Sequence, residues 1–382
     1  MKKMKNYLFL FAVAMSVTAL SACSGKVENK QMDVTIQNET YSGTYTGDTE
    51  SKKPSGEGEF SGQSDGNQIK YTGEWTDGAP SGKGKVENLP VKITITKTEY
   101  EGNYTGDTVD GKPDGTGDFK YEKDDVKVSY SGSWSKGNMS GDGKLEDSDF
   151  TIWFPKSKDK ASKGAFSGDT KDGHPSKGSY TGINSEGEKY TYTGEWANDT
   201  WEGQGKRDFE NSEINDAIGT FKNGSFTPTL RELMVSLGTW KIIPFTLSDT
   251  NGAFIDKNED LFIQSKQKGN SADAADTSIS YKQYIKQPEA YEGKLMITSN
   301  QQVLQIGETK GDSYPGGVLT QMLTLDSENY EDYYVAYYCG SLKDIYQDSQ
   351  VVMVGLPIAS TYFDNTSGGQ TNCVVLLLTG LK

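Results

Sequence analysis

The chain has 382 residues, enough for two or three domains, but its 33% hydrophobic content and 44 glycines are unusual for one large packed core. The formal net charge of −15 disfavours binding to nucleic-acid phosphate, which requires a basic surface. After Leu20 the sequence has no apolar run of about 18 residues, so it predicts no later membrane-spanning segment.

The N-terminus has the pattern of an export signal. Lysines near the first residue precede an apolar stretch at residues 7–20, and Leu20-Ser21-Ala22-Cys23 follows. This pattern resembles the lipobox of bacterial lipoproteins. The resemblance implies cleavage before Cys23, acylation of its thiol and anchoring at the extracytoplasmic face of the cell membrane. The alternative is an ordinary secretory signal with a chance cysteine. Residues 24–36 are expected to form a tether.

From residue 37 to residue 226 one phrase recurs about every thirty residues, which predicts a repeat architecture. Copies begin at Tyr41, Tyr71, Tyr100, Tyr130, Ser162 and Tyr192, with a faded copy at residues 217–221. Two kinds alternate. The copies that begin at Tyr71, Tyr130 and Tyr192 carry Trp75, Trp134 and Trp196, whereas the others carry Tyr45, Tyr104 and Phe166 in that place.

Strand geometry explains the phrase, because side chains two residues apart share a face. Tyr71, Gly73 and Trp75 then line one face of a strand. A single hairpin cannot bury two aromatic rings, so a neighbouring copy is expected to lay a ring over the bare backbone at Gly73. The same stacking role is predicted for Tyr41, Gly43, Tyr45, Tyr100, Gly102, Tyr104, Tyr130, Gly132, Trp134, Tyr192, Gly194 and Trp196.

The phrase resembles the MORN repeat (membrane occupation and recognition nexus), whose motif is close to Y-x-G-x-W-x-x-G-x-x-x-G-x-G. The copies at Tyr71 and Tyr130 carry every motif position, whereas the copy at Tyr192 has Asp199 in place of the turn glycine. The resemblance implies an elongated sheet of stacked β-hairpins and permits protein or membrane-lipid partners. Two tryptophans outside the motif, Trp153 and Trp201, are predicted to face a glycan or protein ligand, and the alternative is that the aromatic residues only hold the repeats together.

Residues 227–278 are predicted to be a helical connector and linker. Thr229 followed by Glu232, with Gly238 as the stop, predicts a short amphipathic helix. A second helix is expected over residues 248–262, and residues 265–278 are expected to be a flexible linker or a surface loop.

Residues 279–382 are predicted to form a short helix, ended by Pro288, and five strands that close into a small barrel. The expected strands are residues 295–306, 319–325, 333–339, 351–358 and 373–379. The pattern resembles the OB-like domains of Gram-positive exported lipoproteins, which implies an oligosaccharide-type ligand once nucleic acid is set aside. Its tyrosines either face a ligand or fill the barrel. Cys339 and Cys373 are either a disulfide or two buried thiols.

The sequence predicts no catalytic residue, no metal site and no cofactor. Its one histidine, His174, lies in a glycine-proline turn, and no Cys or His cluster has zinc spacing. The fold class predicted is therefore mainly β: a MORN-like repeat sheet, short helices and an OB-like barrel. The function predicted is a non-catalytic binding or scaffold module for protein partners at the cell envelope. The alternatives are a cell-wall or glycan-binding surface protein and a carbohydrate-active enzyme with dispersed carboxylates.

Overall fold

The computed structural model describes residues 24–64, 66–154, 161–211, 214–267 and 271–382. The predicted export signal and the predicted lipid-attachment residue Cys23 lie outside the described residues. The chain divides into two compact units, and each is described by itself. The first takes the described part of Met1–Val91 with Asn103–Gly117 and Trp134–Asn138, and the second takes Lys92–Gly102, Asp118–Ser133 and Met139–Lys382.

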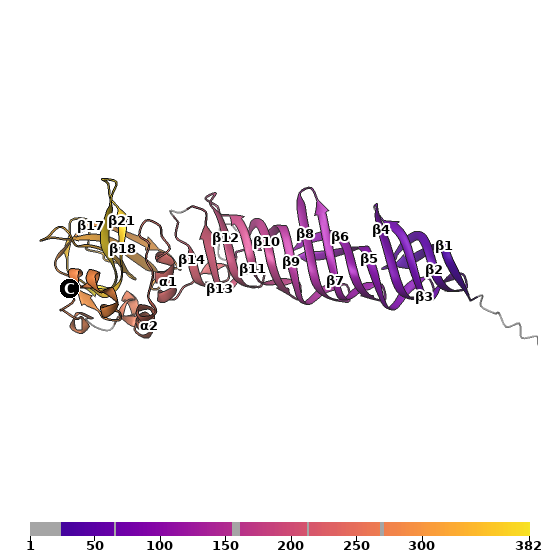
Figure 1. The fold of residues 1–382 in the computed structure, drawn as a ribbon, viewed down its shortest axis with the longest axis horizontal. Helices are drawn as coiled ribbons and strands as arrows, with labels where there is room; N and C mark the ends of the chain where they lie inside the picture. Colours follow the sequence, from indigo (N-terminus) through magenta and orange to yellow (C-terminus); the bar gives the residue numbers. More distant parts are fainter. Residues whose placement is uncertain (1–23, 65, 155–160, 212–213, 268–270) are drawn as a thin grey trace, which may run out of the picture. The chain divides into compact units, whose positions relative to one another are not determined.

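The predicted repeat sheet is confirmed. Fifteen strands form one sheet in which each strand pairs with the next along the chain (Figure 1). They are β1 (Gly25–Ile36), β2 (Glu39–Glu50), β3 (Lys53–Ser64), β4 (Asn67–Thr76), β5 (Ala79–Ile95), β6 (Thr98–Val109), β7 (Lys112–Lys123), β8 (Val126–Ser135), β9 (Asn138–Trp153), β10 (Ala161–Lys171), β11 (His174–Ile183), β12 (Lys189–Ala197), β13 (Thr200–Phe209), β14 (Ala217–Lys222) and β15 (Ser225–Phe226).

Residues 24–36 are not the predicted tether, because β1 occupies nearly all of them. This strand pairs with β2 in antiparallel register, with Val34 opposite Tyr41. Val34 and Ile36 are buried, so the strand contributes its own apolar face to the core of the first unit. The alternation of buried and exposed residues at its end is the signal that the sequence reading overlooked.

Tight turns join the hairpins, and their central residues take the positive φ that two-residue hairpin turns require. Asp77 and Gly78 have φ of 52° and 88°. The copy at Tyr192 has Asn198 and Asp199 there, with φ of 51° and 58°. Asn and Asp tolerate this left-handed region better than other non-glycine residues, which explains how the turn forms without the motif glycine.

Helix α1 is confirmed where the sequence predicts it. It runs from Leu230 to Leu237, and Thr229 and Glu232 form the capping box. Its Ser236 hydroxyl accepts a 2.9 Å hydrogen bond from the Ile218 amide and donates a 3.1 Å bond to the Ile218 carbonyl in β14. The helix thus satisfies backbone groups of the last long strand of the repeat sheet.

The two other predicted helices are present, whereas short 3-10 turns in the predicted linker at residues 265–278 are not expected from the sequence. The predicted helix over residues 248–262 ends early, at Lys257, because Asn258 leaves the helical conformation. The helices after α1 are α2 (Asp249–Lys257), η1 (Glu259–Leu261), η2 (Gln264–Lys266), η3 (Ser271–Ala274), α3 (Tyr281–Lys286) and η4 (Pro288–Tyr291).

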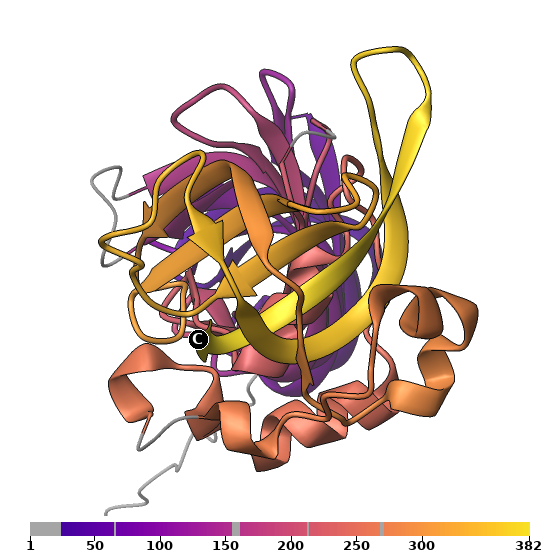
Figure 2. The same cartoon turned by 90° about the vertical axis from the view of Figure 1, so that its left-hand side faces the viewer.

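The C-terminal sheet has seven strands where the sequence predicts five. Two of the predicted runs are each split in two by a break in pairing. The sheet curls into a half-barrel, with the short helices gathered along one side (Figure 2). Its strands are β16 (Met296–Ile297), β17 (Gln301–Lys310), β18 (Val318–Asp326), β19 (Tyr333–Tyr338), β20 (Gln350–Val351), β21 (Met353–Asp364) and β22 (Gln370–Leu381), in the order β16-β21-β22-β19-β18-β17-β20.

The central strands β19 and β22 are parallel and are buried on both faces. Tyr337 belongs to the cluster that includes α1 and α2, whereas Tyr334 and Tyr338 belong to the cluster that includes α3. These tyrosines therefore fill the core. Tyr330, in contrast, is 63% exposed.

The disulfide considered for Cys339 and Cys373 is not formed, and both are free, buried thiols. Cys373 pairs with Tyr333 at the start of β19, and Cys339 lies six residues further along the same strand direction. At the rise of a parallel strand this separates the two cysteines by about 20 Å. A disulfide needs Cα atoms within about 7 Å, so the fold excludes the bond.

Candidate functional site

The predicted stacking residues all lie in the repeat sheet, and all their aromatic rings are buried. The tyrosine hydroxyls repeat one hydrogen bond, to the backbone carbonyl three residues later. The pairs are Tyr45 with Asp48, Tyr71 with Glu74, Tyr104 with Asp107, Tyr130 with Ser133 and Tyr192 with Glu195, at distances of 2.9, 3.3, 2.6, 3.0 and 2.8 Å. Each of these tyrosines therefore fills the core with its ring and satisfies a backbone carbonyl with its hydroxyl.

This repeated bond corrects the predicted register of the copies without tryptophan. The sequence alignment places Tyr45 at the position of Trp75. In the structure, however, the Tyr45 hydroxyl bonds the carbonyl three residues later, as the Tyr71 hydroxyl does, so Tyr45 is equivalent to Tyr71. Thr49 therefore takes the place of tryptophan, and it too is buried. The structural repeat begins four residues later in these copies than the aligned phrase suggests, because the sequence comparison gave weight to Tyr41.

The glycines explain why the rings fit. A Cβ atom at Gly84 would overlap the ring and hydroxyl of Tyr71, and one at Gly58 would overlap Tyr45. The ring that covers Gly73 is also that of Tyr71, from the same copy, and not from the neighbouring copy as predicted. Gly43 is different, because Phe60 from the next strand covers it.

The tryptophans join one copy to the preceding one. The indole Nε1 atoms of Trp75, Trp134 and Trp196 donate to the carbonyls of Gly58, Gly117 and Gly178 at 3.1, 3.0 and 3.3 Å. Their rings also pack against Tyr45, Tyr104 and Phe166 with centroids 5.5, 4.9 and 5.1 Å apart. The two kinds of copy therefore alternate because each hairpin with tryptophan is bonded to the hairpin without tryptophan that precedes it.

The prediction that Trp201 is exposed on the surface is wrong. Trp201 is 1% exposed, and its ring stacks on Tyr192 with centroids 4.6 Å apart and an interplanar angle of 13°. It pairs across the strands with Trp196, where the Tyr71 copy has Pro80 opposite Trp75. Both positions point into the core. Trp153 is 39% exposed, but Lys97 Nζ lies 4.2 Å from its ring centroid.

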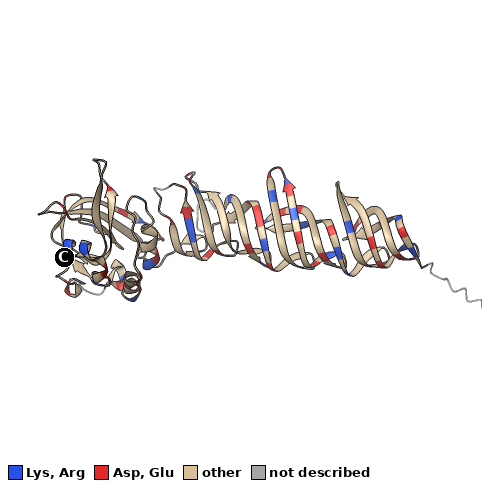
Figure 3. Cartoon of the chain, viewed as in Figure 1, with Lys and Arg blue, Asp and Glu red and all other residues tan. Residues whose placement is uncertain are grey.

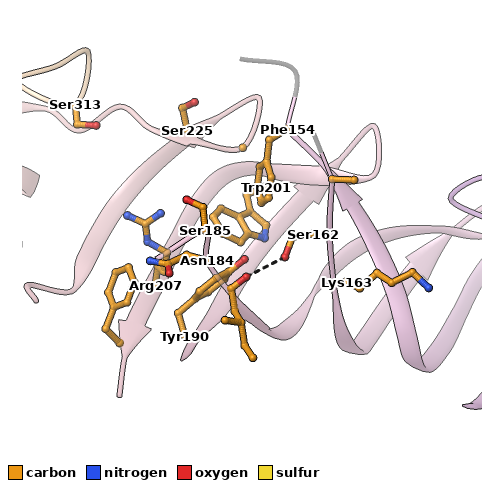
Figure 4. A pocket seen from close by; sticks show the side chains of 14 residues that line it. Phe154, Ser162, Lys163, Asn184, Ser185, Tyr190, Trp201, Arg207, Ser225 and Ser313 are labelled. Atoms are coloured by element: carbon orange, nitrogen blue, oxygen red, sulfur yellow. Dashed lines mark hydrogen bonds between the residues drawn. The ribbon is translucent and has the colours of Figure 1, made fainter. Parts of the chain in front are cut away.

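A cavity of about 630 Å³ lies against this end of the repeat sheet, within the second unit (Figure 4). Its rings are Phe154, Tyr190, Trp201 and Phe209, and most of its other side chains are serines and Asn184. Tyr190 and Trp201 are buried with centroids 5.7 Å apart, so they form a rigid wall. A concave site of this size with aromatic walls and a few polar groups is the usual form of a small-ligand site.

Arg207 is the distinctive residue of the cavity. Its guanidinium carbon lies 5.0 Å from the centroid of Phe209 and 6.0 Å from that of Trp201. Burial lowers the pKa of Arg207, and within the described part of the chain its Nε atom has no hydrogen-bond partner. The only other arginine, Arg231, forms ion pairs with Asp249 and Asp256. Sequence analysis missed Arg207, although the rarity of arginine was a usable signal.

Charge in and around the cavity differs from charge on the rest of the repeat sheet. Acidic and basic residues lie interspersed along the strands (Figure 3), where pairs such as Lys53 and Asp77 approach to 2.6 Å. Among the described residues that line the cavity, none is a carboxylate, although the chain has 54 acidic residues. Lys163 also lines it and pairs with Asp149 at 2.7 Å. The cavity is therefore a local exception in an acidic protein.

The other predicted features carry no site chemistry. His174 Nδ1 lies 2.9 Å from Asp199 on the surface and stands alone as a histidine. Within the described ranges, no group of three or more His, Cys, Asp or Glu side chains is placed to hold a metal ion. Over the same residues, no helix is long and apolar enough to span a bilayer.

The fold and the repeated hydrogen bonds define a β-hairpin repeat protein. The family model of the MORN repeat matches residues 71–86, 130–151 and 192–213, so the chain contains MORN repeats. These matches are the three copies with tryptophan; the copies with threonine in its place fall outside them. A comparison with curated proteins finds no match to this chain.

Proposed function

We propose that this protein is a lipoprotein anchored at the extracytoplasmic face of the cell membrane, where it acts by binding and not by catalysis. The anchor rests on the lipobox pattern that ends at Cys23. A membrane or binding role agrees with the MORN repeats. The observation that carries the binding role is the aromatic cavity beside Arg207, because it is concave and rigid-walled and no carboxylate lines it among the described residues.

Two features support binding over catalysis at this cavity. Hydrolysis of a glycosidic bond ordinarily uses two carboxylates, and no described residue that lines the cavity carries one. Its lining also holds no histidine or cysteine among the described residues, so a general base or a thiolate nucleophile is not supplied there.

The cavity favours the glycan-binding alternative over a protein scaffold. The aromatic rings and hydroxyl groups of the cavity suit the faces and edges of sugars, whereas the tryptophans of the repeats are buried inside the sheet. The C-terminal half-barrel is proposed to be the OB-like domain that the sequence resembles. It supplies a second cavity, of about 780 Å³, with largely apolar walls.

The anchor is tested by fractionation of cells that express the wild type, Cys23→Ala and Cys339→Ala. We expect the wild type and Cys339→Ala in the membrane fraction with a lipid-modified N-terminal peptide by mass spectrometry, and Cys23→Ala without that modification. Cys339→Ala is the matched control, because its thiol is buried in the C-terminal core. An unmodified Cys23 in the wild type would refute the anchor.

The binding class is tested by co-sedimentation of the purified protein with cell wall, with lipid vesicles and with a solubilised membrane-protein fraction. We expect retention on wall glycan. A single co-purified membrane protein, with bare wall and vesicles unbound, would instead establish the scaffold role. Release of soluble sugars from wall by the protein, abolished by one carboxylate substitution, would establish the enzyme and refute the proposal.

A further inference from the structure

We propose that the cavity beside Arg207 binds an oxyanion carried on a saccharide, either a carboxylate or a phosphate, with Arg207 as the charged partner. This inference rests on the proposed function, because it names the ligand class of the same cavity. It concerns the residues of β12, β13 and the β11–β12 loop, which line the cavity and belong to one compact unit.

The first argument is the uncompensated cation. Arg207 forms no ion pair with a described carboxylate, and the described groups placed against its charge are the faces of Phe209 and Trp201 and the side chain of Tyr190. Cation–π contacts are worth about 0.5–2 kcal/mol, less than the desolvation of a guanidinium costs. A half-buried cation without an ionic partner among the described residues is stabilised by an anion that enters the cavity. The planar fork of arginine fits carboxylate and phosphate equally well.

The second argument is an excess of hydrogen-bond donors. Trp201 Nε1 has no acceptor within the described residues, but it is closed to solvent, so it does not count among the donors that a ligand reaches. Asn184 uses its Oδ1 atom to accept from the amides of Glu186 and Glu188 at 3.0 and 2.8 Å, which leaves its Nδ2 atom as the group available to a ligand. Donors without acceptors predict a ligand that is rich in acceptor oxygens.

The third argument concerns the body of the ligand. Aliphatic side chains in the lining are limited to Ala161 and Ile183 among the described residues, so a lipid tail would find little apolar surface. Phe154, Tyr190 and Phe209 instead offer flat rings, and Ser185 and Ser225 offer hydroxyls. Rings pack against the C–H faces of a sugar while hydroxyls and amides bond its edges. A cavity of about 630 Å³ accommodates a unit of this size.

Isothermal titration of the purified protein with four probes tests the ligand class. The probes are trigalacturonic acid, glucose 6-phosphate, neutral cellotriose and inorganic phosphate. We expect at least one acidic saccharide to bind ten times more tightly than both cellotriose and inorganic phosphate, and the two acidic probes distinguish carboxylate from phosphate. Equal binding of cellotriose, or binding of inorganic phosphate alone, would overturn the proposal, and so would no binding by any probe.

Three variants test the site. Arg207→Met keeps the apolar stem and is expected to weaken binding at least tenfold, and Ser185→Asp places a carboxylate at the exposed rim and is expected to do the same without disturbing the core. Lys171→Gln removes an exposed lysine that pairs with Asp142 at 3.1 Å, and should stay within twofold. Wild-type affinity in folded Arg207→Met would refute the role of Arg207; if that variant fails to fold, Ser185→Asp decides.

The outcome is separable from that of the proposed function. Loss of saccharide binding in the titration, together with retention of the protein on cell wall, would overturn the acidic-sugar ligand and leave wall binding in place. Retention of Arg207→Met on cell wall at the wild-type level would show that another surface makes that contact, and would also overturn this inference.

Discussion

The indole Nε1 of Trp75 donates a 3.1 Å hydrogen bond to the carbonyl oxygen of Gly58, seventeen residues earlier in the chain. The same relationship recurs at Trp134 with Gly117 and at Trp196 with Gly178. Glycine is needed at the acceptor because a Cβ atom there would meet the ring of Tyr45, Tyr104 or Phe166. The bond therefore locks each hairpin that carries tryptophan onto the hairpin before it, and the stable unit of this sheet is a pair of hairpins.

Trp75→Phe is expected to destabilise the protein by about 1–3 kcal/mol, because the half-buried Gly58 carbonyl loses its bond from the indole while most of the ring contacts remain. Trp75→Ala is expected to cost about 3–5 kcal/mol, because it also leaves a cavity. Urea unfolding measures both. Trp153→Phe is the matched control at an exposed tryptophan and should stay within about 0.5 kcal/mol. Equal effects at Trp75 and Trp153 would contradict the bond's role.

Gly84→Ala is expected to destabilise the protein by about 1–3 kcal/mol or more, because its Cβ would overlap the Tyr71 ring. The φ of Gly84 is not in the left-handed region, so the cost is steric and not conformational. Gly307→Ala is the control, since a Cβ there meets no atom within 4 Å. The midpoint of thermal unfolding should fall only for Gly84→Ala. An unchanged midpoint would show that Tyr71 can move.

Glu232 predicts a loss of stability in acid. Burial alone would raise its pKa, but bonds from the Thr229 amide, Gln204 and Thr220 outweigh burial and hold the pKa below its ordinary value. The contribution of ionised Glu232 to the stability of the folded protein is therefore present above its unfolded pKa of about 4.3. It is lost as the pH falls through the native pKa. Glu232→Gln should cost roughly 0.5–1 kcal/mol at pH 7 and nothing below about pH 3. Urea unfolding at both pH values, with the exposed Glu39→Gln as control, measures this; a pH-independent cost would contradict it.

Asp147 predicts the opposite pH dependence. It is 2% exposed, accepts a 3.1 Å bond from the Tyr100 hydroxyl, and burial raises its pKa. Because its native pKa is raised, Asp147 contributes fully to the stability of the folded protein below its unfolded pKa of about 3.9. This contribution is lost as the pH rises through the native pKa. Asp147→Asn should therefore stabilise the protein at pH 7 by roughly 0.5–2 kcal/mol and give no gain at pH 3. Destabilisation at pH 7 by urea unfolding would show that the ionised carboxylate is favourable there.

Cys339 and Cys373 are expected to resist alkylation in the native protein, because burial raises the pKa of each thiol to about 12. Both thiols should react with iodoacetamide in urea without any reductant. Intact mass spectrometry counts the labels. Denatured protein that takes up label only after reduction would reveal a disulfide.

Much of the fold was predictable because it depends on local pattern. The alternation of buried rings and glycines, the turn residues and the capping box at Thr229 and Glu232 all specify structure within a few residues. The errors are also local in origin. Aligning Tyr41 with Tyr71 places its copy four residues out of the structural register. The weak alternation of buried and exposed residues in β1 leads to the incorrect prediction of a tether.

The candidate cavity was not predictable in the same way. The sequence places Trp201 outside the repeat motif and predicts it at the surface, because its cross-strand partner Trp196 and its stacking partner Tyr192 become neighbours only when the hairpin closes. The sequence analysis does not single out Arg207, although it is one of two arginines in the chain. Its lack of a carboxylate partner among the described residues is a property of the surrounding side chains, which come from several strands and loops.

The sequence by itself determined the repeat, its period, its two kinds of copy and the short helix after it, because each depends on residues that are close along the chain. The tertiary structure alone decided that Trp75 bonds Gly58, that the C-terminal sheet curls as a seven-stranded half-barrel, and that Cys339 lies too far from Cys373 for a disulfide. It also decided that Arg207 has no ion-pair partner among the residues that the structure describes. Those facts depend on strand register and burial, which bring distant residues together and set the cost of leaving a polar group unpaired.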